Sequence, residues 1–273
     1  MVKVTFDTLK RDAKIFDALK NNTPSWWQYC KNEKTFYIEV RKDNLIEIYF
    51  EGGRIIKVHY CSRQKKLQTF THYKYLGLKD KTKTYVNCVD IIDNQIDTIT
   101  NGIKKHYSQK NGREKESWSE KYIQGHLITN NRNIHLDSEF AYIDDDSNVQ
   151  IDLVKCVNGT VIFVELKRLD DDRMLKKTDE SPEIVFQMKS YGDFIKKYRD
   201  KILAYYRKLY DIKKDLDLPV PEVRPQKVST VPELLIFNRW THLDKQGRRK
   251  NHLSRMEEIL QREKVSYSII DSF

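Results

Sequence analysis

The sequence of 273 residues lacks the features that mark membrane, secreted and zinc-stabilised proteins. No apolar run approaches the roughly 20 residues of a membrane-spanning helix, so we expect no membrane partner. The opening segment, MVKVTFDTLKRDAK, has no apolar stretch of signal-peptide character. The four cysteines stand singly, with no C-x-x-C pair and no Cys/His cluster at zinc-ligand spacing. We therefore expect a cytoplasmic protein without a disulfide framework or structural zinc.

Internal repeats and low-complexity segments are also missing from the chain. Hydrophobic residues make up 39% of the sequence and aromatic residues 11%, which is enough to build a packed core and excludes wholesale disorder. The length predicts one large domain or two modest ones.

Positive charge is concentrated in the first part of the chain. Residues 1–110 hold 21 Lys and Arg against 12 Asp and Glu, whereas residues 111–273 hold 29 against 28. A basic segment joined to a nearly neutral one points to a polyanion partner such as nucleic acid. A basic surface that only aids solubility is the alternative.

The apolar patterns and turn signals predict a mixed sheet flanked by helices, preceded by a β-rich N-terminal domain. A polar stretch, residues 108–115, reads as a linker and coincides with the change in charge. We accordingly predict a basic domain over 1–110, for nucleic-acid binding or dimerisation, and a second domain over 111–273. The expected elements are a helix over 6–19, an antiparallel meander of strands over 36–40, 45–50 and 54–60, helices over 89–107 and 116–127, strands over 140–143, 149–157 and 160–167, an interrupted helix over 182–215, a strand over 231–237, a helix over 252–264 and a strand over 266–270.

The segment 148–168 carries the most informative pattern. Asn158-Gly159 between two apolar runs is a strong signal for a two-residue hairpin, because a type I′ turn needs positive φ at both central positions. Such a turn places Asp152 opposite Glu165, and Gln150 opposite Lys167. Alternation keeps Glu165 and Lys167 on one face of the strand. Opposed carboxylates destabilise a sheet unless a cation lies between them, and hard Mg²⁺ suits carboxylate oxygens. A simple salt bridge from Lys167 at a sheet edge is the alternative.

This pattern resembles the signature of the PD-(D/E)XK nuclease superfamily, which combines an acidic residue, a hairpin and E-x-K. Gln187 and Tyr191 resemble the Q-x-x-x-Y element of its RecB-like branch, and at this spacing both lie on one helix face. Glu120 occupies the place of an extra acidic ligand on the first core helix. The ordered set is most similar to the catalytic domain of NucS-type endonucleases. The resemblance covers about residues 115–200 and implies a restriction-endonuclease-like core.

The resemblance also implies roles for these residues. Asp152 and Glu165 would bind Mg²⁺ or Mn²⁺ with help from the Leu166 carbonyl, and Glu120 would hold a second metal or a water. Lys167 would position the attacking hydroxide. Gln187 and Tyr191 would orient the lysine or contact the phosphate.

The sequence departs from the family pattern in two places. The glycine that often precedes the aspartate is absent, since Gln150 and Ile151 occupy that region. The acidic run Asp170-Asp171-Asp172 follows directly after the E-x-K strand, where close contact with DNA would be unfavourable. Arg168 and Arg173 could grip a phosphate there or be an ordinary solvated pair.

The leading functional hypothesis is a Mg²⁺-dependent deoxyribonuclease that hydrolyses phosphodiester bonds, as an endonuclease. The alternatives are an RNase, a partner-activated nuclease and a nucleic-acid-binding protein with a nuclease-like fold that does not cleave. DNA is the expected partner, RNA the alternative one, and a second copy of the chain would form a homodimer.

Overall fold

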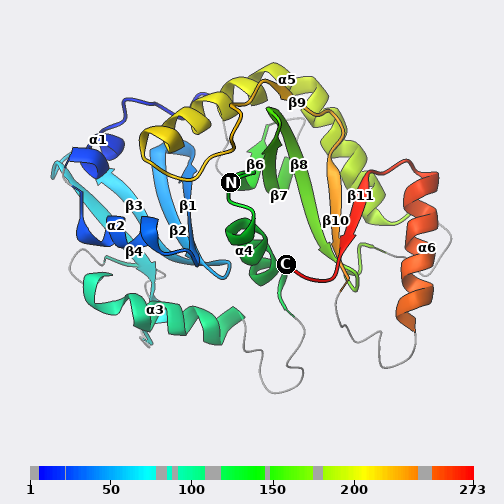
Figure 1. Cartoon of the computed structure of the whole chain (residues 1–273), viewed down its shortest axis with the longest axis horizontal. Coiled ribbons are helices and arrows are strands. Elements are labelled where there is room, and N and C mark those ends of the chain that lie inside the picture. The colour runs from blue at the N-terminus through cyan, green and yellow to red at the C-terminus, as the bar shows by residue number, and fades with distance from the viewer. Residues whose placement is uncertain are drawn as a thin grey trace. The chain divides into compact units, whose positions relative to one another are not determined.

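The computed structural model describes residues 6–21, 23–77, 85–87, 92–107, 118–144, 148–174, 181–238 and 248–273. These residues form six α-helices and two β-sheets, which confirms the expected mixed α/β class (Figure 1). Internal contacts divide the chain into an N-terminal unit, Thr5–Asn133 with Arg207–Val220, and a C-terminal unit, Ile134–Tyr206 with Pro221–Phe273. No helix in the described ranges is both long and apolar enough to cross a membrane. The predicted linker over 108–115 lies outside the described residues.

The sheet of the N-terminal unit contains the predicted antiparallel meander of three strands and two further strands that were not predicted, all in consecutive order. Its strands are β1 (Phe36–Arg41), β2 (Leu45–Phe50), β3 (Gly53–Cys61), β4 (Lys66–His72) and β5 (Tyr85–Asn87). The turn signal at Asp43-Asn44 is confirmed, whereas the second turn forms at Glu51-Gly52, one residue before the Gly52-Gly53 signal. Asp43 and Asn44 adopt positive φ between β1 and β2, and Glu51 and Gly52 do so between β2 and β3. Short polar residues and glycine are the types that tolerate this conformation.

Helices pack against this sheet in the same unit. They are α1 (Lys14–Asn21), α2 (Ser25–Asn32), α3 (Ile92–Tyr107) and α4 (Glu120–Asn130), with the short 3₁₀ segments η1 (Lys42–Asn44) and η2 (Tyr73–Leu76). The helix predicted over 6–19 begins later, at Lys14. Isoleucines at 96, 99 and 103 give α3 a buried face, as helical spacing predicts.

Two glycines bring α4 against the turn between β2 and β3. A Cβ atom on Gly52 would lie 1.9 Å from the Lys121 carbonyl oxygen, and one on Gly125 would lie 2.5 Å from the Gly52 nitrogen. Gly52 also has a φ of +79°, which glycine adopts without strain. Because of this close packing, α4 belongs to the N-terminal unit, whereas the charge pattern predicts a domain boundary at residue 110.

Buried ion pairs join the last turns of α5 (Glu183–Asp215) to the meander within the N-terminal unit. The Lys213 ammonium lies 2.8 Å from the Glu39 carboxylate, and both side chains are almost fully buried. Glu39 pairs across the ladder with Glu47, which Arg41 and Arg54 neutralise. Each of these opposed carboxylates therefore has its own cation, which removes the repulsion between them.

The C-terminal unit is built on a mixed sheet in the order β11-β10-β8-β7-β6, with β9 paired to β8 (Figure 1). The strands are β6 (His135–Ile143), β7 (Asn148–Val157), β8 (Thr160–Arg168), β9 (Lys227–Val228), β10 (Glu233–Phe237) and β11 (Tyr267–Ile270). β6, β7 and β8 are antiparallel, whereas β8, β10 and β11 are parallel. β8 lies at the centre and is buried along most of its length, as its apolar sequence predicts.

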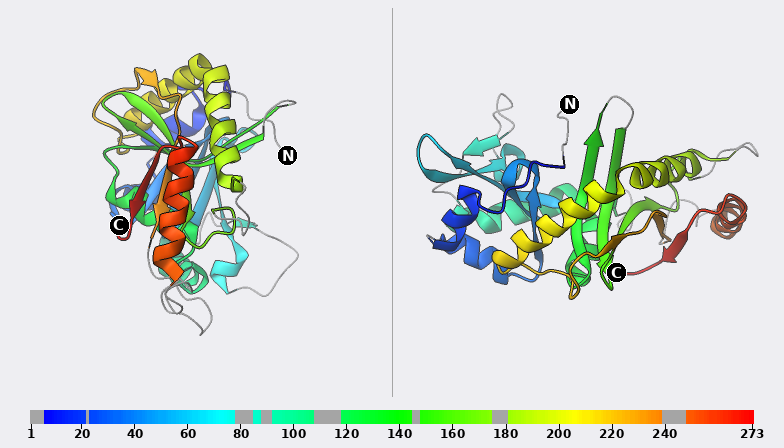
Figure 2. Two further views of the ribbon diagram at one scale, coloured as in Figure 1. Left: turned by 90° about the vertical axis from the view of Figure 1, so that its right-hand side faces the viewer. Right: turned by 90° about the horizontal axis from the view of Figure 1, so that it is seen from above.

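Two helices belong to this sheet. The N-terminal part of α5, as far as Tyr206, lies in this unit, and its backbone departs from helical geometry at Tyr198, where φ is −113°. This kink is the interruption predicted in the long helix. α6 (Arg248–Arg262) lies beside β11 (Figure 2). Phe140, Phe163 and Tyr206 form an aromatic core in which ring centroids are 5.2 to 6.2 Å apart.

Replacing Gly125 by alanine tests the packing of α4. Alanine usually stabilises a helix by up to about 1 kcal/mol relative to glycine. Here its Cβ would meet the Gly52 backbone, so we expect the Gly125→Ala variant to lose about 1–3 kcal/mol in free energy of unfolding. Urea denaturation measures the change, with Asn130→Ala at an exposed position of the same helix as the control. A gain in stability for Gly125→Ala would show that the close contact is absent.

Candidate functional site

The hairpin of β7 and β8 forms in the predicted register. Asn158 and Gly159 both have positive φ, and cross-strand partners run from Val157 with Thr160 to Leu153 with Val164. Asp152 and Glu165 are the next residues of the two strands. The regular ladder ends there, because the Asp152 carboxylate accepts a hydrogen bond from the Leu166 backbone N–H at 2.9 Å. The predicted pairings of Asp152 with Glu165 and of Gln150 with Lys167 are both outside the ladder.

The side chains of the hairpin form a compact charged cluster. The Lys167 ammonium donates to the Glu165 carboxylate at 2.5 Å and to the Leu166 carbonyl at 2.9 Å, and it lies 3.7 Å from the Asp152 carboxylate. Glu165 and Lys167 are almost fully buried, with 3% and 2% of their side chains exposed, while Asp152 is 27% exposed. The cluster therefore presents one partly open carboxylate in front of a buried ion pair.

Helix α5 supplies two further side chains to the cluster. Gln187 and Tyr191 lie one turn apart, and the Gln187 amide donates to the Glu165 carboxylate at 2.9 Å and to the Tyr191 hydroxyl at 2.6 Å. The Tyr191 hydroxyl in turn donates to the Gln150 carbonyl. A chain of hydrogen bonds thus connects α5 with both strands of the hairpin, and the structure brings five of the six predicted side chains together.

Two buried acceptors in this cluster have no hydrogen-bond donor. They are the second carboxylate oxygen of Glu165, Oε2, and the amide oxygen of Gln187, Oε1. Leaving a buried acceptor unpaired costs about 1–3 kcal/mol, and more for a charged group. A cation, a bound water or a proton on Glu165 would remove this cost at the carboxylate. The cluster is therefore incomplete as a purely structural salt bridge.

Burial dominates the electrostatics of Glu165. It raises the pKa of this carboxyl from 4.5 to about 7; the negative charge of Asp152 adds to the shift, and Lys167 opposes it. The folded chain thus holds this proton more tightly than the unfolded chain. The contribution of this group to stability consequently falls as the pH rises from about 4.5 to about 7.

Two of the three aspartates in the acidic run after β8 form ion pairs with neighbouring arginines. Arg168 contacts the carboxylate of Asp170 at 2.6 Å, and Arg173 contacts that of Asp171 at 2.7 Å. Burial raises the pKa of Asp171, but its bonds to Arg173 outweigh this effect and hold it at about 2. Both arginines are therefore engaged within the chain. Arg168 and Arg173 flank the three aspartates in the sequence, and this arrangement was the signal for these pairs.

The sixth predicted site residue, Glu120, lies on α4. It is the first residue of α4, behind the N-cap Ser119, whose side chain accepts a hydrogen bond from the Tyr122 backbone N–H. A carboxylate in the first turn of a helix is stabilised by the helix dipole. α4 belongs to the N-terminal unit and the hairpin to the C-terminal unit, and the role of Glu120 as a ligand stays a prediction.

The donor set at the hairpin suits a hard divalent cation. Asp152, Glu165 and the Leu166 carbonyl offer oxygen atoms only, and Mg²⁺ is commonly held by one or two carboxylates together with waters. The unpaired Glu165 oxygen is the observation that favours this fit. Among the residues that the structure describes, no three His, Cys, Asp or Glu side chains gather into a cluster with metal-site geometry. Two carboxylates are therefore the most that this site offers from its own unit.

Comparison with known proteins gives no match: no protein-family model, no curated protein and no solved structure is similar to this chain. The interpretation of the hairpin cluster consequently depends on its own residues and geometry.

The proton on Glu165 can be measured directly. In metal-free buffer we expect the side-chain carboxyl of Glu165 to titrate with a midpoint of about 7 in carbon-13 NMR spectra. Asp152→Asn should lower this midpoint, because it removes a neighbouring negative charge, and Lys167→Gln should raise it, because it removes the compensating ammonium. Glu165→Gln identifies the signal by deleting it. A midpoint near 4.5 in the unaltered chain would contradict the burial of this carboxyl.

Proposed function

We propose that this chain is a metal-dependent nuclease that hydrolyses phosphodiester bonds of DNA, as an endonuclease. The observation that carries the proposal is the hairpin cluster itself. Two carboxylates and a lysine converge at the end of a paired ladder, and one buried carboxylate oxygen lacks a donor. Glu39 and Glu47 each have their own cation, whereas Asp152 and Glu165 share the single ammonium of Lys167, which leaves negative charge for a second cation.

Each residue of the cluster would have a defined task. Asp152 and Glu165 would hold Mg²⁺ or Mn²⁺ through their carboxylate oxygens, together with the Leu166 carbonyl. The metal would stabilise the negative charge that gathers on the phosphate in the transition state. Lys167 would orient the attacking water, since its ammonium lies between both carboxylates. Gln187 would hold Glu165 in place, and Tyr191 would hold Gln187.

Charge favours a nucleic-acid substrate, and the resemblance to the PD-(D/E)XK nucleases favours DNA. The excess of positive charge over residues 1–110 suits a phosphate backbone of either nucleic acid. The resemblance to NucS-type endonucleases favours DNA, and an RNase is the alternative with the same cluster. We also propose that the chain acts in the cytoplasm.

One observation favours a nucleic-acid-binding protein that does not cleave. The Lys167 ammonium already contacts the carboxylate of Glu165 and lies close to that of Asp152, so an internal cation neutralises the site. A metal would have to share these oxygen atoms with the lysine. The two proposals differ in whether a divalent cation binds at the cluster.

Digestion assays test the proposed activity. Linear, closed circular and single-stranded DNA, and a matched RNA, are incubated with the protein in Mg²⁺, Mn²⁺ or EDTA. We expect metal-dependent cleavage that includes closed circles, and a loss of at least about 100-fold in Glu165→Gln and Lys167→Gln, because each removes charge stabilisation of the transition state. Cleavage confined to RNA would identify an RNase.

The chain offers a matched control in the same unit. Lys155 and Glu233 form an ion pair at 2.6 Å on β7 and β10, outside the cluster. Lys155→Gln and Glu233→Gln should keep full activity, and urea denaturation of all variants separates a lost site from a lost fold. Calorimetric titration with Mn²⁺ completes the test. Binding of neither metal nor DNA would remove the proposal, and DNA binding without metal binding or cleavage would establish the non-cleaving alternative.

Tyr191→Phe tests the role of α5 in positioning the cluster. The variant keeps the aromatic ring but loses the hydroxyl that bonds Gln187 and the Gln150 carbonyl. We expect a modest loss of cleavage, roughly tenfold or less, because Gln187 keeps its bond to Glu165. Metal affinity should change little. A loss as large as that of Lys167→Gln would instead place Tyr191 among the residues that contact the substrate.

A further inference from the structure

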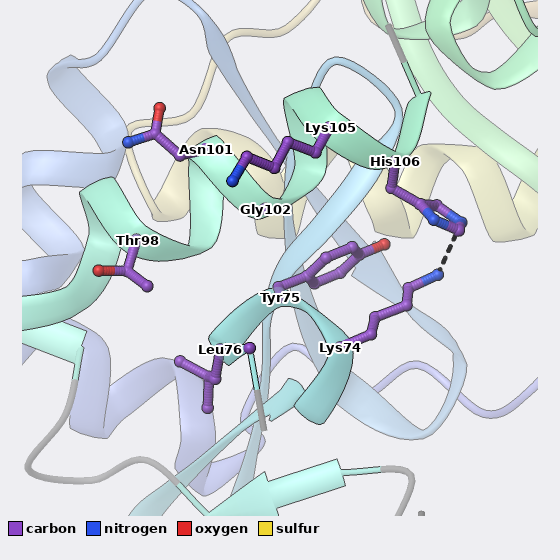
Figure 3. Close-up of a pocket in the computed structure, with 9 residues that line it drawn as sticks. Lys74, Tyr75, Leu76, Thr98, Asn101, Gly102, Lys105 and His106 are labelled. Atoms are coloured by element: carbon purple, nitrogen blue, oxygen red, sulfur yellow. Dashed lines mark hydrogen bonds between the residues drawn. The ribbon is translucent and has the colours of Figure 1, made fainter. Parts of the chain in front are cut away.

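A second polar site lies entirely within the N-terminal unit, between η2 and α3. Here a pocket of about 460 Å³ opens, a volume in the range of small-molecule sites (Figure 3). Gly102 allows the two elements to touch, since a Cβ atom there would lie 2.6 Å from the Tyr75 carbonyl oxygen. The pocket is lined by Lys74, Tyr75, Leu76, Gly77, Thr98, Asn101, Gly102, Lys105 and His106.

The lining carries three basic side chains and no carboxylate. Lys74 comes from η2, and Lys105 and His106 come from the last turn of α3 (Figure 3). The Lys74 ammonium and the His106 ring nitrogen Nε2 lie only 3.0 Å apart. In the part of the chain that the structure describes, none of the three forms an ion pair with an acidic residue. This contrasts with the buried cations of the same unit, which are matched to Glu39 and Glu47.

The Lys74 ammonium donates a hydrogen bond to the neutral form of the His106 ring. Partial burial lowers the pKa of Lys74, and burial together with the Lys74 charge lowers the pKa of His106. The Lys74 ammonium also lies over the rings of Tyr75 and Tyr107, at 4.9 and 5.7 Å from their centroids. These rings hold the ammonium at the pocket wall. A bound anion would be attracted by this ammonium.

Uncharged donors complete the lining. Thr98, Asn101 and Lys105 follow one another at helical spacing along one face of α3, whereas Ile99 and Ile103 are buried. A hydroxyl, an amide and the two ammonium groups of Lys74 and Lys105 can donate to several oxygen atoms, which suits a phosphate group. The volume leaves room for more than the phosphate alone.

We propose that this pocket binds the phosphate group of a nucleotide or of a nucleic-acid strand. The proposal does not depend on the nuclease activity, because every residue involved belongs to the N-terminal unit. The pocket would be a specific site at which the positively charged first part of the chain contacts a phosphate. The competing explanation is that Lys105 and His106 only compensate the dipole at the C-terminal end of α3.

Calorimetric titration of the full chain with adenosine 5′-monophosphate tests this proposal. EDTA is present throughout, so that binding at the hairpin cluster does not contribute. We expect the nucleotide to bind and adenosine, which lacks the phosphate, not to bind. Lys74→Gln and Lys105→Gln should each weaken binding roughly tenfold, because each removes a charge-assisted hydrogen bond. Lys66→Gln, at an exposed position of β4 outside the pocket, should leave the affinity unchanged.

Oligonucleotides distinguish the two sources of the phosphate. A single strand with a 5′-phosphate is compared with the same strand without it, by fluorescence anisotropy. Stronger binding of the phosphorylated strand, lost in Lys105→Gln, assigns the pocket to strand ends. Equal binding of both strands, also weakened in Lys105→Gln but not in Lys66→Gln, assigns it to the phosphate backbone.

Two results would overturn the proposal. One is the absence of binding by all of these probes at millimolar concentration while the chain remains folded. The other is an equal loss of affinity in Lys66→Gln and Lys105→Gln, which would indicate attraction by overall charge alone. If Lys105→Gln lowers the free energy of unfolding without changing any affinity, the basic residues serve the helix dipole instead.

Discussion

The turn at Asn158-Gly159 is the constraint on which the candidate site depends. Two successive residues with positive φ fix a two-residue loop, and the loop fixes which residues of β7 and β8 lie side by side. A shift by one residue would move Glu165 and Lys167 to the opposite face of the strand. The correct register instead leaves two carboxylates together. The fold then has to supply a cation, which is Lys167, and donors for the remaining oxygen atoms, of which Gln187 is one.

Protons, the lysine ammonium and a metal ion would compete for the same oxygen atoms in this cluster. Glu165 is buried enough that its proton stays bound to about neutral pH, while Asp152 remains partly open to solvent. Binding of a divalent cation would displace the proton and loosen the contact with Lys167. The site is thus balanced between a neutral, internally paired state and a state that is open to a ligand. This balance explains why the geometry is compatible both with the proposed nuclease and with a nucleic-acid-binding protein that does not cleave.

The N-terminal unit distributes its positive charge unevenly. Lys213, Arg41 and Arg54 neutralise the buried carboxylates of Glu39 and Glu47, and so contribute to the packing of the meander. Lys74, Lys105 and His106 are instead directed to a pocket without acidic residues. Net charge alone does not separate these two groups, because it counts paired and unpaired cations equally.

The sequence by itself determined the features that depend on neighbouring residues. Two local signals, the turn residues Asn158 and Gly159 and the alternation along β8, were sufficient to predict the hairpin, its register near the turn and the charged face. Turn conformation and side-chain alternation are both local properties of the backbone. The tertiary structure decided which distant surfaces meet. Gly125 packs on Gly52, and η2 packs on α3 at Gly102, because glycine permits close approach of segments far apart in the chain. β10 also lies parallel to β8, from which it is distant in the sequence. No short segment encodes such contacts, because their free energy comes from burying two complementary faces at once.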